Sequence, residues 1–361
     1  MAYRYVDKVY PFNLSPASLD WYLARGWYRM GSNIFTTHFL CFQQQMYSAI
    51  WIRLDLREYQ FSKSQRKLMR RNAQRFTSEI GRRKFTLEKE MLYANYARQL
   101  DGRLSPSLRD NLEEYDENGV FNTYEVVIRE RETNQLVAAS YFDLGKESAA
   151  SILGIYEPDF ERYSLGYYSM LLEVEYCLEQ GYEYYYPGYV VPGYHRFDYK
   201  KRIGSTDYLD VRTDSWLPLA DFNTDDGPVE QQQRQLDELR KDLEASGVTA
   251  EILLYPLFEA RLYHIWQSNY LSSPFILLLG PRPEPGDATL LVVFDPHSEA
   301  FQLLYCHCLR ELRYLFSEQY LNSFPSDRFL IALLEQERLL LEEQDREKFA
   351  NKLLEILKTK K

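Results

Sequence analysis

The chain has 361 residues, 45% hydrophobic and 27% charged, which is the balance of a globular protein large enough for a substantial core. Its formal net charge of −10 argues against non-specific nucleic-acid binding by the whole surface but is compatible with a local basic face. No apolar run reaches membrane-span length, the start lacks a secretory leader, and four cysteines are too few for a disulfide scaffold. We therefore expect a cytoplasmic protein that does not bind membranes.

The first distinctive element in chain order is a basic helix. Ser62 and Gln65 have the S-x-x-Q spacing of a capping box, which predicts a helix beginning at this point. Residues 63–84 contain nine basic residues and one acid, Glu79. A solvated helix face is one interpretation, but pairing with acids cannot account for the run, and positive charge in the first turns opposes the helix macrodipole. We therefore favour contact with nucleic-acid phosphates.

The middle of the chain gives the clearest secondary-structure pattern. Alternating apolar residues predict strands, and a 3.6-residue period predicts helices. The predicted strands are residues 48–56, 124–130, 136–144, 149–156 and 184–191, and the predicted helices are residues 87–99 and 165–180. From residue 124 this order is a hairpin followed by a β-α-β unit, the central order of the N-acetyltransferase-like (GNAT) fold. We therefore expect an α/β (α+β) architecture with such a core.

The last third of the chain is predicted to be mostly helical. A polar linker at residues 221–227 precedes a charged helix over residues 228–246, and a strand-like hairpin follows at residues 275–279 and 289–294. The end is rich in Leu, Glu and Lys, with heptad-like spacing. The Cys306-His307-Cys308 segment lacks a second ligand pair, so we interpret its cysteines as structural.

These patterns divide the chain into three predicted parts. Residues 1–120 form an N-terminal segment with the basic helix, and residues 121–220 form an acyltransferase-like core. Residues 228–361 form an α-rich C-terminal module whose role the sequence does not indicate.

Several motifs, in the same order, resemble those of the arginyl-tRNA–protein transferase (aminoacyl-tRNA–protein transferase) family. The resemblance covers roughly residues 20–212. It rests on Gly26-Trp27-Tyr28-Arg29-Met30-Gly31, Ser62-Lys63-Ser64-Gln65-Arg66, Phe142-Asp143-Leu144-Gly145, Tyr156-Glu157-Pro158-Asp159-Phe160, Ser164-Leu165-Gly166-Tyr167-Tyr168, Gly181-Tyr182-Glu183-Tyr184-Tyr185-Tyr186-Pro187-Gly188-Tyr189 and Tyr199-Lys200. The family's N-terminal cysteine set is missing, because the corresponding stretch offers only His38 and Cys41 where a structural zinc site needs four ligands. We therefore expect no metal and no other cofactor.

The resemblance implies transfer of an aminoacyl group, with arginine favoured, from charged tRNA to the α-amine at a protein's N-terminus, which marks that protein for degradation. It implies the following sites. Lys63, Gln65, Arg66, Arg70 and Arg71 would bind tRNA, Asp143, Tyr168 and Tyr189 would surround the transfer centre, and Arg196 and Lys200 would bind the acceptor peptide. Asp143 has an equal alternative role in capping a turn. The tyrosines of residues 182–199 divide between strand packing and pocket lining.

Two rival functions remain at this point. The first is an acyl-CoA-dependent N-acyltransferase on the same fold. Gly166 suits a pyrophosphate-binding turn, but Tyr168 stands where a small residue is needed, so we expect no coenzyme A. The second is a degenerate, non-catalytic relative that binds proteins through residues 228–361. Tight coenzyme A binding would support the first rival, and turnover with charged tRNA would exclude the second.

Overall fold

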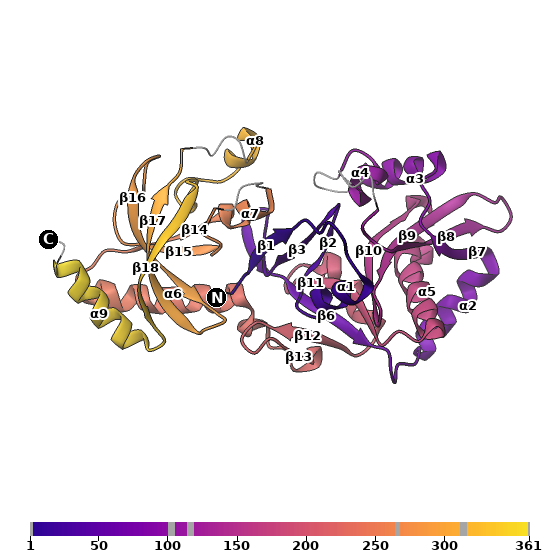
Figure 1. The fold of residues 1–361 in the computed structure, drawn as a ribbon, viewed down its shortest axis with the longest axis horizontal. Coiled ribbons are helices and arrows are strands. Elements are labelled where there is room, and N and C mark those ends of the chain that lie inside the picture. The colour runs from indigo at the N-terminus through magenta and orange to yellow at the C-terminus, as the bar shows by residue number, and fades with distance from the viewer. Residues whose placement is uncertain (1–2, 100–104, 114–118, 264–267, 311–315, 360–361) are drawn as a thin grey trace.

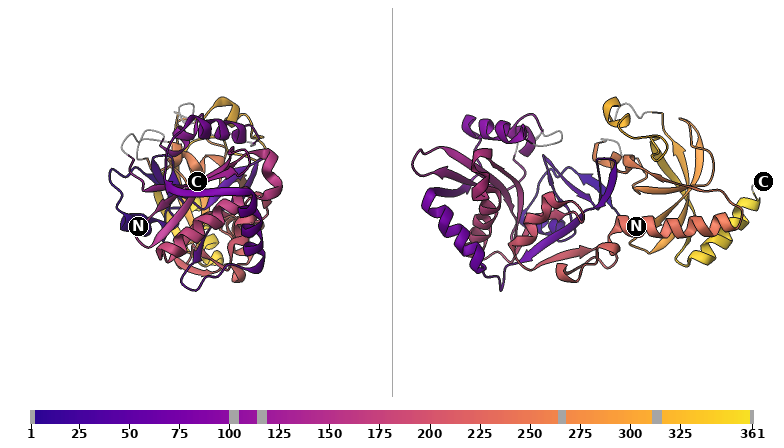
Figure 2. Two further views of the ribbon diagram at one scale, coloured as in Figure 1. Left: turned by 90° about the vertical axis from the view of Figure 1, so that its right-hand side faces the viewer. Right: turned by 180° about the vertical axis from the view of Figure 1, so that it is seen from behind.

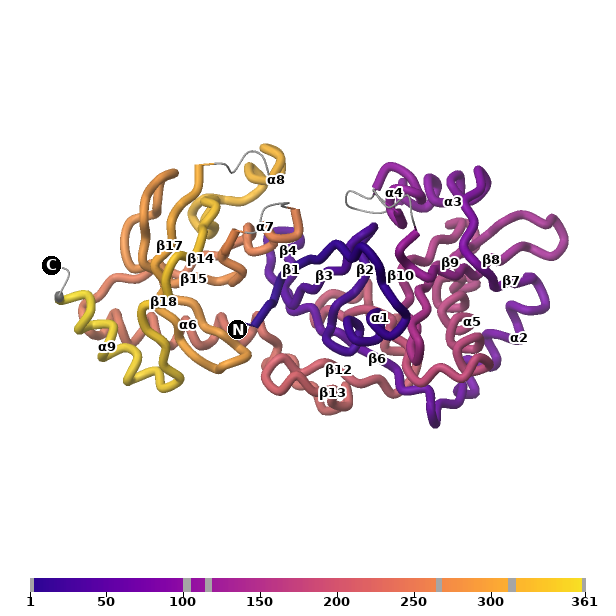
Figure 3. The backbone as a smooth tube through the Cα atoms, viewed as in Figure 1, coloured from indigo at the N-terminus to yellow at the C-terminus, as the bar shows by residue number. Residues whose placement is uncertain are grey.

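A computed structural model describes residues 3–99, 105–113, 119–263, 268–310 and 316–359 of the protein. The described chain forms an elongated molecule with one large sheet toward each end (Figure 1). The end-on and rear views show the same lengthwise arrangement (Figure 2), and the tube drawing shows N-terminal strands between the two sheets (Figure 3).

The larger sheet has eight strands and is assembled from residues far apart in the chain. Across the sheet its strands are β13 (Ser215–Pro218), β12 (Thr206–Asp210), β6 (Ile50–Asp55), β11 (Tyr184–Val190), β10 (Ser148–Tyr156), β9 (Leu136–Leu144), β8 (Thr123–Glu130) and β7 (Phe76–Arg82). Every neighbouring pair is antiparallel except β10 and β11, which are parallel. A parallel pair needs a crossover connection, and helix α5 (Leu165–Gln180) supplies it.

The helices of this half cover both faces of the larger sheet. Helices α5 and α2 (Lys63–Arg75) pack on one face, where Phe142 belongs to their apolar cluster. Helices α3 (Leu87–Ala97) and α4 (Leu108–Leu112) cover the other face, where Tyr141, the residue before Phe142, is buried. Successive side chains of a strand point to opposite faces of its sheet, so neighbouring residues of β9 enter different clusters when both faces are covered. Helix α5 ends at Gly181, whose φ of 78° is the left-handed conformation that favours glycine.

The capping box predicted at the start of the basic helix is confirmed. The Ser62 side chain accepts a hydrogen bond from the Gln65 backbone, and the Gln65 side chain accepts one from the Ser62 backbone. The run of basic residues extends beyond this helix, because the helix ends at Arg75 and the chain continues directly into strand β7. Phe76 is buried against Phe160 and Tyr163, and this packing, together with pairing to β8, outweighs local helix propensity.

Short elements at the N-terminus lie between the two large sheets. Strands β1 (Val6–Val9), β3 (Asn33–Thr37) and β2 (Tyr28–Met30) form a three-stranded sheet, and β4 (Phe39–Phe42) pairs with β5 (Gln45–Ser48). Helix α1 (Pro16–Leu23) is capped by Ser15, whose side chain accepts a hydrogen bond from the Ser18 backbone N–H. The Tyr5 hydroxyl donates to Asp295, so the residue just before the first strand contacts the second half of the chain.

The prediction of an α-rich C-terminal module was wrong. The second sheet has five antiparallel strands in the order β14 (Glu251–Leu254), β15 (Phe275–Leu278), β16 (Ala288–Asp295), β17 (Ala300–Cys308) and β18 (Leu334–Glu343). Helices α6 (Pro228–Ala245) and α9 (Arg346–Thr359) pack beside it, and α7 (Ala260–Tyr263) and α8 (Glu318–Leu321) are short. The predicted division of the chain at residue 228 stays a prediction.

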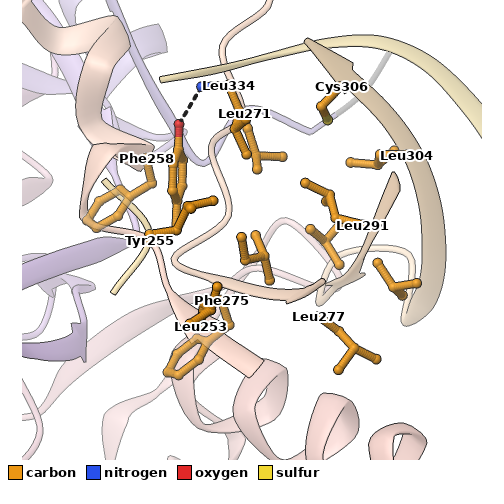
Figure 4. Close-up of a cluster of buried hydrophobic side chains, with 14 of the residues drawn as sticks. Leu253, Tyr255, Phe258, Leu271, Phe275, Leu277, Leu291, Leu304, Cys306 and Leu334 are labelled. Carbon is orange, nitrogen blue, oxygen red and sulfur yellow. Dashed lines mark hydrogen bonds between the residues drawn. The ribbon is translucent and has the colours of Figure 1, made fainter. Parts of the chain in front are cut away.

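A large apolar cluster explains why the leucine-rich end forms strands. Leu304 and Cys306 on β17 face Leu271 and Leu334, and the Leu334 backbone N–H donates to the buried Tyr255 hydroxyl over 3.0 Å (Figure 4). Pairing between β17 and β18 holds this segment extended although leucine and glutamate favour helices. Cys306 and Cys308 are both buried.

Candidate active site

Strands β10 and β11 part from one another soon after they begin to pair. Their parallel register covers Ser148 to Ala150 on β10 and Tyr184 to Tyr186 on β11. Beyond this point β10 shifts register against β9 at Ser151, and β11 shifts against β6 before Gly188, whose φ is 95°. The diverging backbones therefore do not satisfy one another's hydrogen bonds. Such a divergence at the carboxyl ends of parallel strands offers backbone amides to a ligand.

The Tyr28 side chain fills the point where the two strands separate. Its hydroxyl lies 2.9 Å from the Ser151 carbonyl oxygen on β10 and also contacts the Tyr186 carbonyl oxygen on β11. The Tyr28 ring stacks on Trp51 with centroids 5.2 Å apart, and burial raises the pKa of the phenol well above its usual value. Tyr28 therefore holds the two strands at a fixed separation.

Lys200 lies beside the same divergence. It belongs to the 3-10 helix η2 (His195–Ile203), which follows β11. Its Nζ donates to the Tyr189 carbonyl oxygen over 3.1 Å and lies 5.4 Å from the Tyr189 ring centroid and 5.2 Å from that of Phe197. A Cβ atom on Gly188 would come within 3.0 Å of this nitrogen, so glycine permits the approach. Burial lowers the Lys200 pKa to about 8.

Four tyrosines lie near the Arg196 side chain at the point where β10 and β11 part. Tyr156 ends β10, and its ring lies 5.3 Å from that of Tyr96 on α3. Burial raises the pKa values of Tyr96, Tyr156 and Tyr199, and raises that of Tyr189 to about 12. The Arg196 charge opposes the rise at all four phenols, so this exposed guanidinium lies close to them. Aromatic faces next to a cation can hold an acidic or a planar ligand.

Glu173 on α5 is fully buried, near Tyr28 and Tyr199. The Tyr185 hydroxyl donates to its carboxylate over 2.6 Å. Burial raises the Glu173 pKa to about 7, and the carboxylate in turn raises the pKa values of Tyr28 and Tyr199. A carboxyl group with this pKa is about half protonated at neutral pH.

Asp143 lies on β9 opposite Ala150, the last β10 residue that pairs with β11. Its carboxylate is fully buried and accepts hydrogen bonds from Arg29 over 2.8 Å and from the Thr123 hydroxyl over 2.6 Å. These contacts support a structural role, and a direct role in transfer stays an untested prediction. Tyr168, in contrast, lies apart from Tyr189. It belongs to the cluster under α5 and α2, whereas Tyr189 packs with Trp51 on the opposite face of the sheet.

The basic helix presents most of its predicted tRNA-binding residues to solvent. Lys63, Arg66, Arg70 and Arg71 are exposed, and in the described part of the chain no carboxylate lies within ion-pair distance of them. Gln65 differs, because it is buried and its amide donates to the Ile203 carbonyl oxygen over 2.7 Å. Gln65 therefore connects α2 to η2, the helix that carries Lys200.

A hollow of about 790 Å³ lies beside the start of the basic helix. Its lining includes Ser62 and Gln65 from the capping box, Arg57, and Arg202 of η2. The hollow therefore joins the basic helix to the helix that carries Arg196 and Lys200.

Comparison with known proteins identifies the segment that contains this site. Residues 88–210 match the family model described as arginine-tRNA-protein transferase, C terminus. This segment is therefore similar to the aminoacyl-tRNA–protein transferases that the sequence motifs resemble. An aspartate/glutamate leucyltransferase of Leptospira interrogans is 28% identical over 204 residues, which span 53% of this chain and 74% of that protein. The protein of the same name in Ruegeria pomeroyi is 29% identical over 175 residues, which span 47% of this chain and 62% of its own length.

The matched solved structures superpose less well. The C-terminal domain of a putative lysylphosphatidylglycerol synthetase from Agrobacterium fabrum has 15% identity and a TM-score of 0.32, and the match covers 39% of this chain and 46% of that one. No helix among the described residues is long and apolar enough to cross a membrane. The described residues also contain no group of three or more His, Cys, Asp or Glu placed to hold a metal ion.

The family-matched segment contains residues that the sequence interpretation did not assign to a site. Tyr96 lies on a helix without a distinctive motif, so no pattern indicated that it would meet Tyr156. Glu173 was part of the quoted α5 sequence, but only its burial distinguishes it from Glu175, which is partly exposed. Upstream of the matched segment, Tyr28 stood in a recognised motif. Its position between two strands depends on tertiary contacts that spacing does not indicate.

Proposed function

We propose that this protein transfers an aminoacyl group from charged tRNA to the N-terminal α-amine of an acceptor protein. The observation that carries the proposal is the convergence of Tyr189, Arg196 and Lys200 where β10 and β11 part. The same divergence supports an N-acetyltransferase-like core within residues 121–220, since that fold places its acyl group between two separating parallel strands.

The chemistry needs little from the protein beyond alignment and charge stabilisation. An aminoacyl ester is already activated, so the acceptor amine attacks its carbonyl carbon directly, without a covalent enzyme intermediate. In this proposal, backbone amides of the separated strands stabilise the oxyanion that forms. The α-amine must lose its proton before it attacks, and its unperturbed pKa is near 8.

The exposed cations of α2 are the proposed contacts to the tRNA backbone. Lys63, Arg66, Arg70 and Arg71 have no carboxylate within ion-pair distance in the described chain, so they are free to neutralise phosphates. We assign Gln65 a positioning role instead, because its side chain is already bonded to η2.

The proposed donor is leucine and the proposed acceptor begins with Asp or Glu. The names of the two bacterial relatives support both assignments. The resemblance in sequence favoured arginine as donor, so arginine is the alternative to test. Arg196 suits an acidic first residue, because a guanidinium binds a carboxylate through paired hydrogen bonds. Such a modification would mark the acceptor for degradation.

A transfer assay tests this function against its rivals. Radiolabelled leucyl-tRNA and arginyl-tRNA are each incubated with the protein and with peptides that begin with Asp, Glu, Lys or Arg. We expect leucine to enter the Asp and Glu peptides. A parallel reaction with acetyl-CoA tests the acyl-CoA-dependent rival. Acetyl transfer without aminoacyl transfer would overturn the proposal in favour of that rival, and no transfer from any donor would favour a non-catalytic binding protein.

A further inference from the structure

Lys200 is a partly buried lysine that has no acidic partner among the residues the structure describes. Its Nζ contacts a carbonyl oxygen and two aromatic rings, and in the described part of the chain no carboxylate lies within ion-pair distance of it. The next residue is a natural comparison, because Lys201 forms an ion pair with Asp198 over 2.7 Å with its side chain 43% exposed. The two lysines are adjacent in sequence but differ completely in surroundings.

The groups that pack around Lys200 do not stabilise its charge strongly. Tyr28 on β2 approaches the same Gly188 backbone, and Tyr189 on β11 presents its ring and carbonyl oxygen. Tyr199 and Arg196 on η2 are neighbours along the helix, and Glu173 on α5 is held by Tyr185. Loss of hydration is the cause of the lowered Lys200 pKa of about 8. A substantial fraction of Lys200 is therefore neutral at physiological pH.

We propose that Lys200 is the general base that removes a proton from the acceptor's α-ammonium group. This inference rests on the proposed function and assigns a catalytic role within the same site. Its basis is geometric, since Nζ lies against the backbone of β11 where that strand leaves β10, the place proposed for the ester carbonyl.

The proton and electron balance of the step is complete. Neutral Lys200 accepts one proton from the α-ammonium, and the freed nitrogen lone pair forms the C–N bond to the ester carbonyl carbon. The C–O bond to the tRNA ribose then breaks, and that oxygen leaves with the electron pair and takes the second proton from the nitrogen. Protonated Lys200 releases its proton to solvent. The products are the amide, the free ribose hydroxyl and one proton.

Other titratable groups near the divergence fit this role less well. Tyr189 has a pKa of about 12, too high for a base at neutral pH, and Glu173 is fully enclosed. The His195 side chain is 93% exposed and bonded to Asp198, so it points toward solvent. Arg196 cannot accept a proton.

Two substitutions at Lys200 separate basicity from charge. Lys200→Arg keeps the positive charge but cannot act as a base, so we expect transfer at saturating acceptor to fall by roughly 10²- to 10⁴-fold. Lys200→Cys treated with bromoethylamine restores an amine of lower intrinsic basicity. We expect it to recover activity and to move the acidic limb of the kcat profile to lower pH. The matched controls, Lys201→Arg and bromoethylamine-treated Lys201→Cys, should keep wild-type rates and profiles.

The outcomes distinguish this inference from the proposed function. Wild-type transfer together with an active Lys200→Arg variant would overturn the base role and leave the function standing. Absence of wild-type transfer with every donor would overturn both. A titration that needs no activity completes the test, in which the lysines are reductively methylated with ¹³C and followed by NMR against Lys200→Arg. A Lys200 signal that titrates near the solution value would also overturn the base role.

Discussion

The Arg29 guanidinium and the Asp143 carboxylate form an ion pair of 2.8 Å whose side chains are 2% and 0% exposed. Arg29 also donates to the Gly31 carbonyl oxygen over 2.8 Å, and its Cζ lies 4.1 Å from the Phe121 ring centroid. The pair joins the N-terminal glycine-aromatic-arginine motif to the end of β9. Because Tyr28 precedes Arg29, the same contact fixes the residue that separates β10 from β11.

We expect Asp143→Asn to destabilise the fold. Removal of one partner leaves the Arg29 charge buried without compensation, which costs about 3–5 kcal/mol. Urea unfolding of the variant should show this loss, with transfer per folded molecule largely retained. A variant of wild-type stability that has lost transfer would instead support a direct catalytic role for Asp143.

Alanine at Arg66, Arg70 and Arg71 together should weaken tRNA binding without changing stability. These side chains are exposed, and each neutralised phosphate contributes about 0.9 to the slope of log affinity against log salt concentration. We expect that slope to become shallower by about 2–3 and the affinity to fall at least about tenfold. The charge-matched control is the triple alanine variant of Lys241, Arg328 and Lys348, which are exposed in the second half of the chain. Equal losses in the two variants would show that only net charge matters.

The buried Glu173 should make the protein less stable as pH rises. Its folded pKa of about 7 lies above the unfolded value of 4.5, so the folded state binds the proton more tightly. Stability from this group is therefore full below pH 4.5 and is lost as the pH rises to about 7. Glu173→Gln should match the wild type at pH 4 and exceed its free energy of unfolding by roughly 2–3 kcal/mol at pH 8. Parallel pH profiles of the two proteins would contradict the assigned burial.

Lys200→Met should stabilise the protein while removing its activity. The folded pKa of about 8 lies below the unfolded value of 10.5, so burial of this amine lowers stability at neutral pH and the loss disappears as pH rises from 8 to 10.5. Thermal unfolding at pH 7 should show a gain of roughly 1–3 kcal/mol that vanishes near pH 11. A destabilised variant at pH 7 would mean that the Lys200 amine is well solvated.

Where local pattern and tertiary environment agree, the sequence predicted the structure well. The predicted bounds of β9 and α5 are those observed, because a continuous apolar run and a glycine stop mark them clearly. The leucine-rich segment that became β18 was misinterpreted as helix, since pairing with β17 decides its conformation.

The residues of the candidate site also differ in how far the sequence could predict their positions. Tyr189, Arg196 and Lys200 were predicted from motif position, and the structure brings them together at one end of β11. The partner that Asp143 finds in Arg29 lies 114 residues away, and no spacing rule connects the two. Within the described chain, Lys200 has no carboxylate partner whereas Lys201 pairs with Asp198, and this difference depends on which residues surround each lysine in space.

The most direct test of the central claim is the mass of an acceptor peptide after incubation with leucyl-tRNA and the protein. A peptide that begins with Asp and has a free α-amine is compared with the same peptide acetylated at that amine. The account predicts addition of one leucyl residue at the N-terminus of the free peptide and no change in the acetylated one. An unmodified free peptide with leucyl-tRNA and with arginyl-tRNA, or addition to the acetylated peptide, would contradict it.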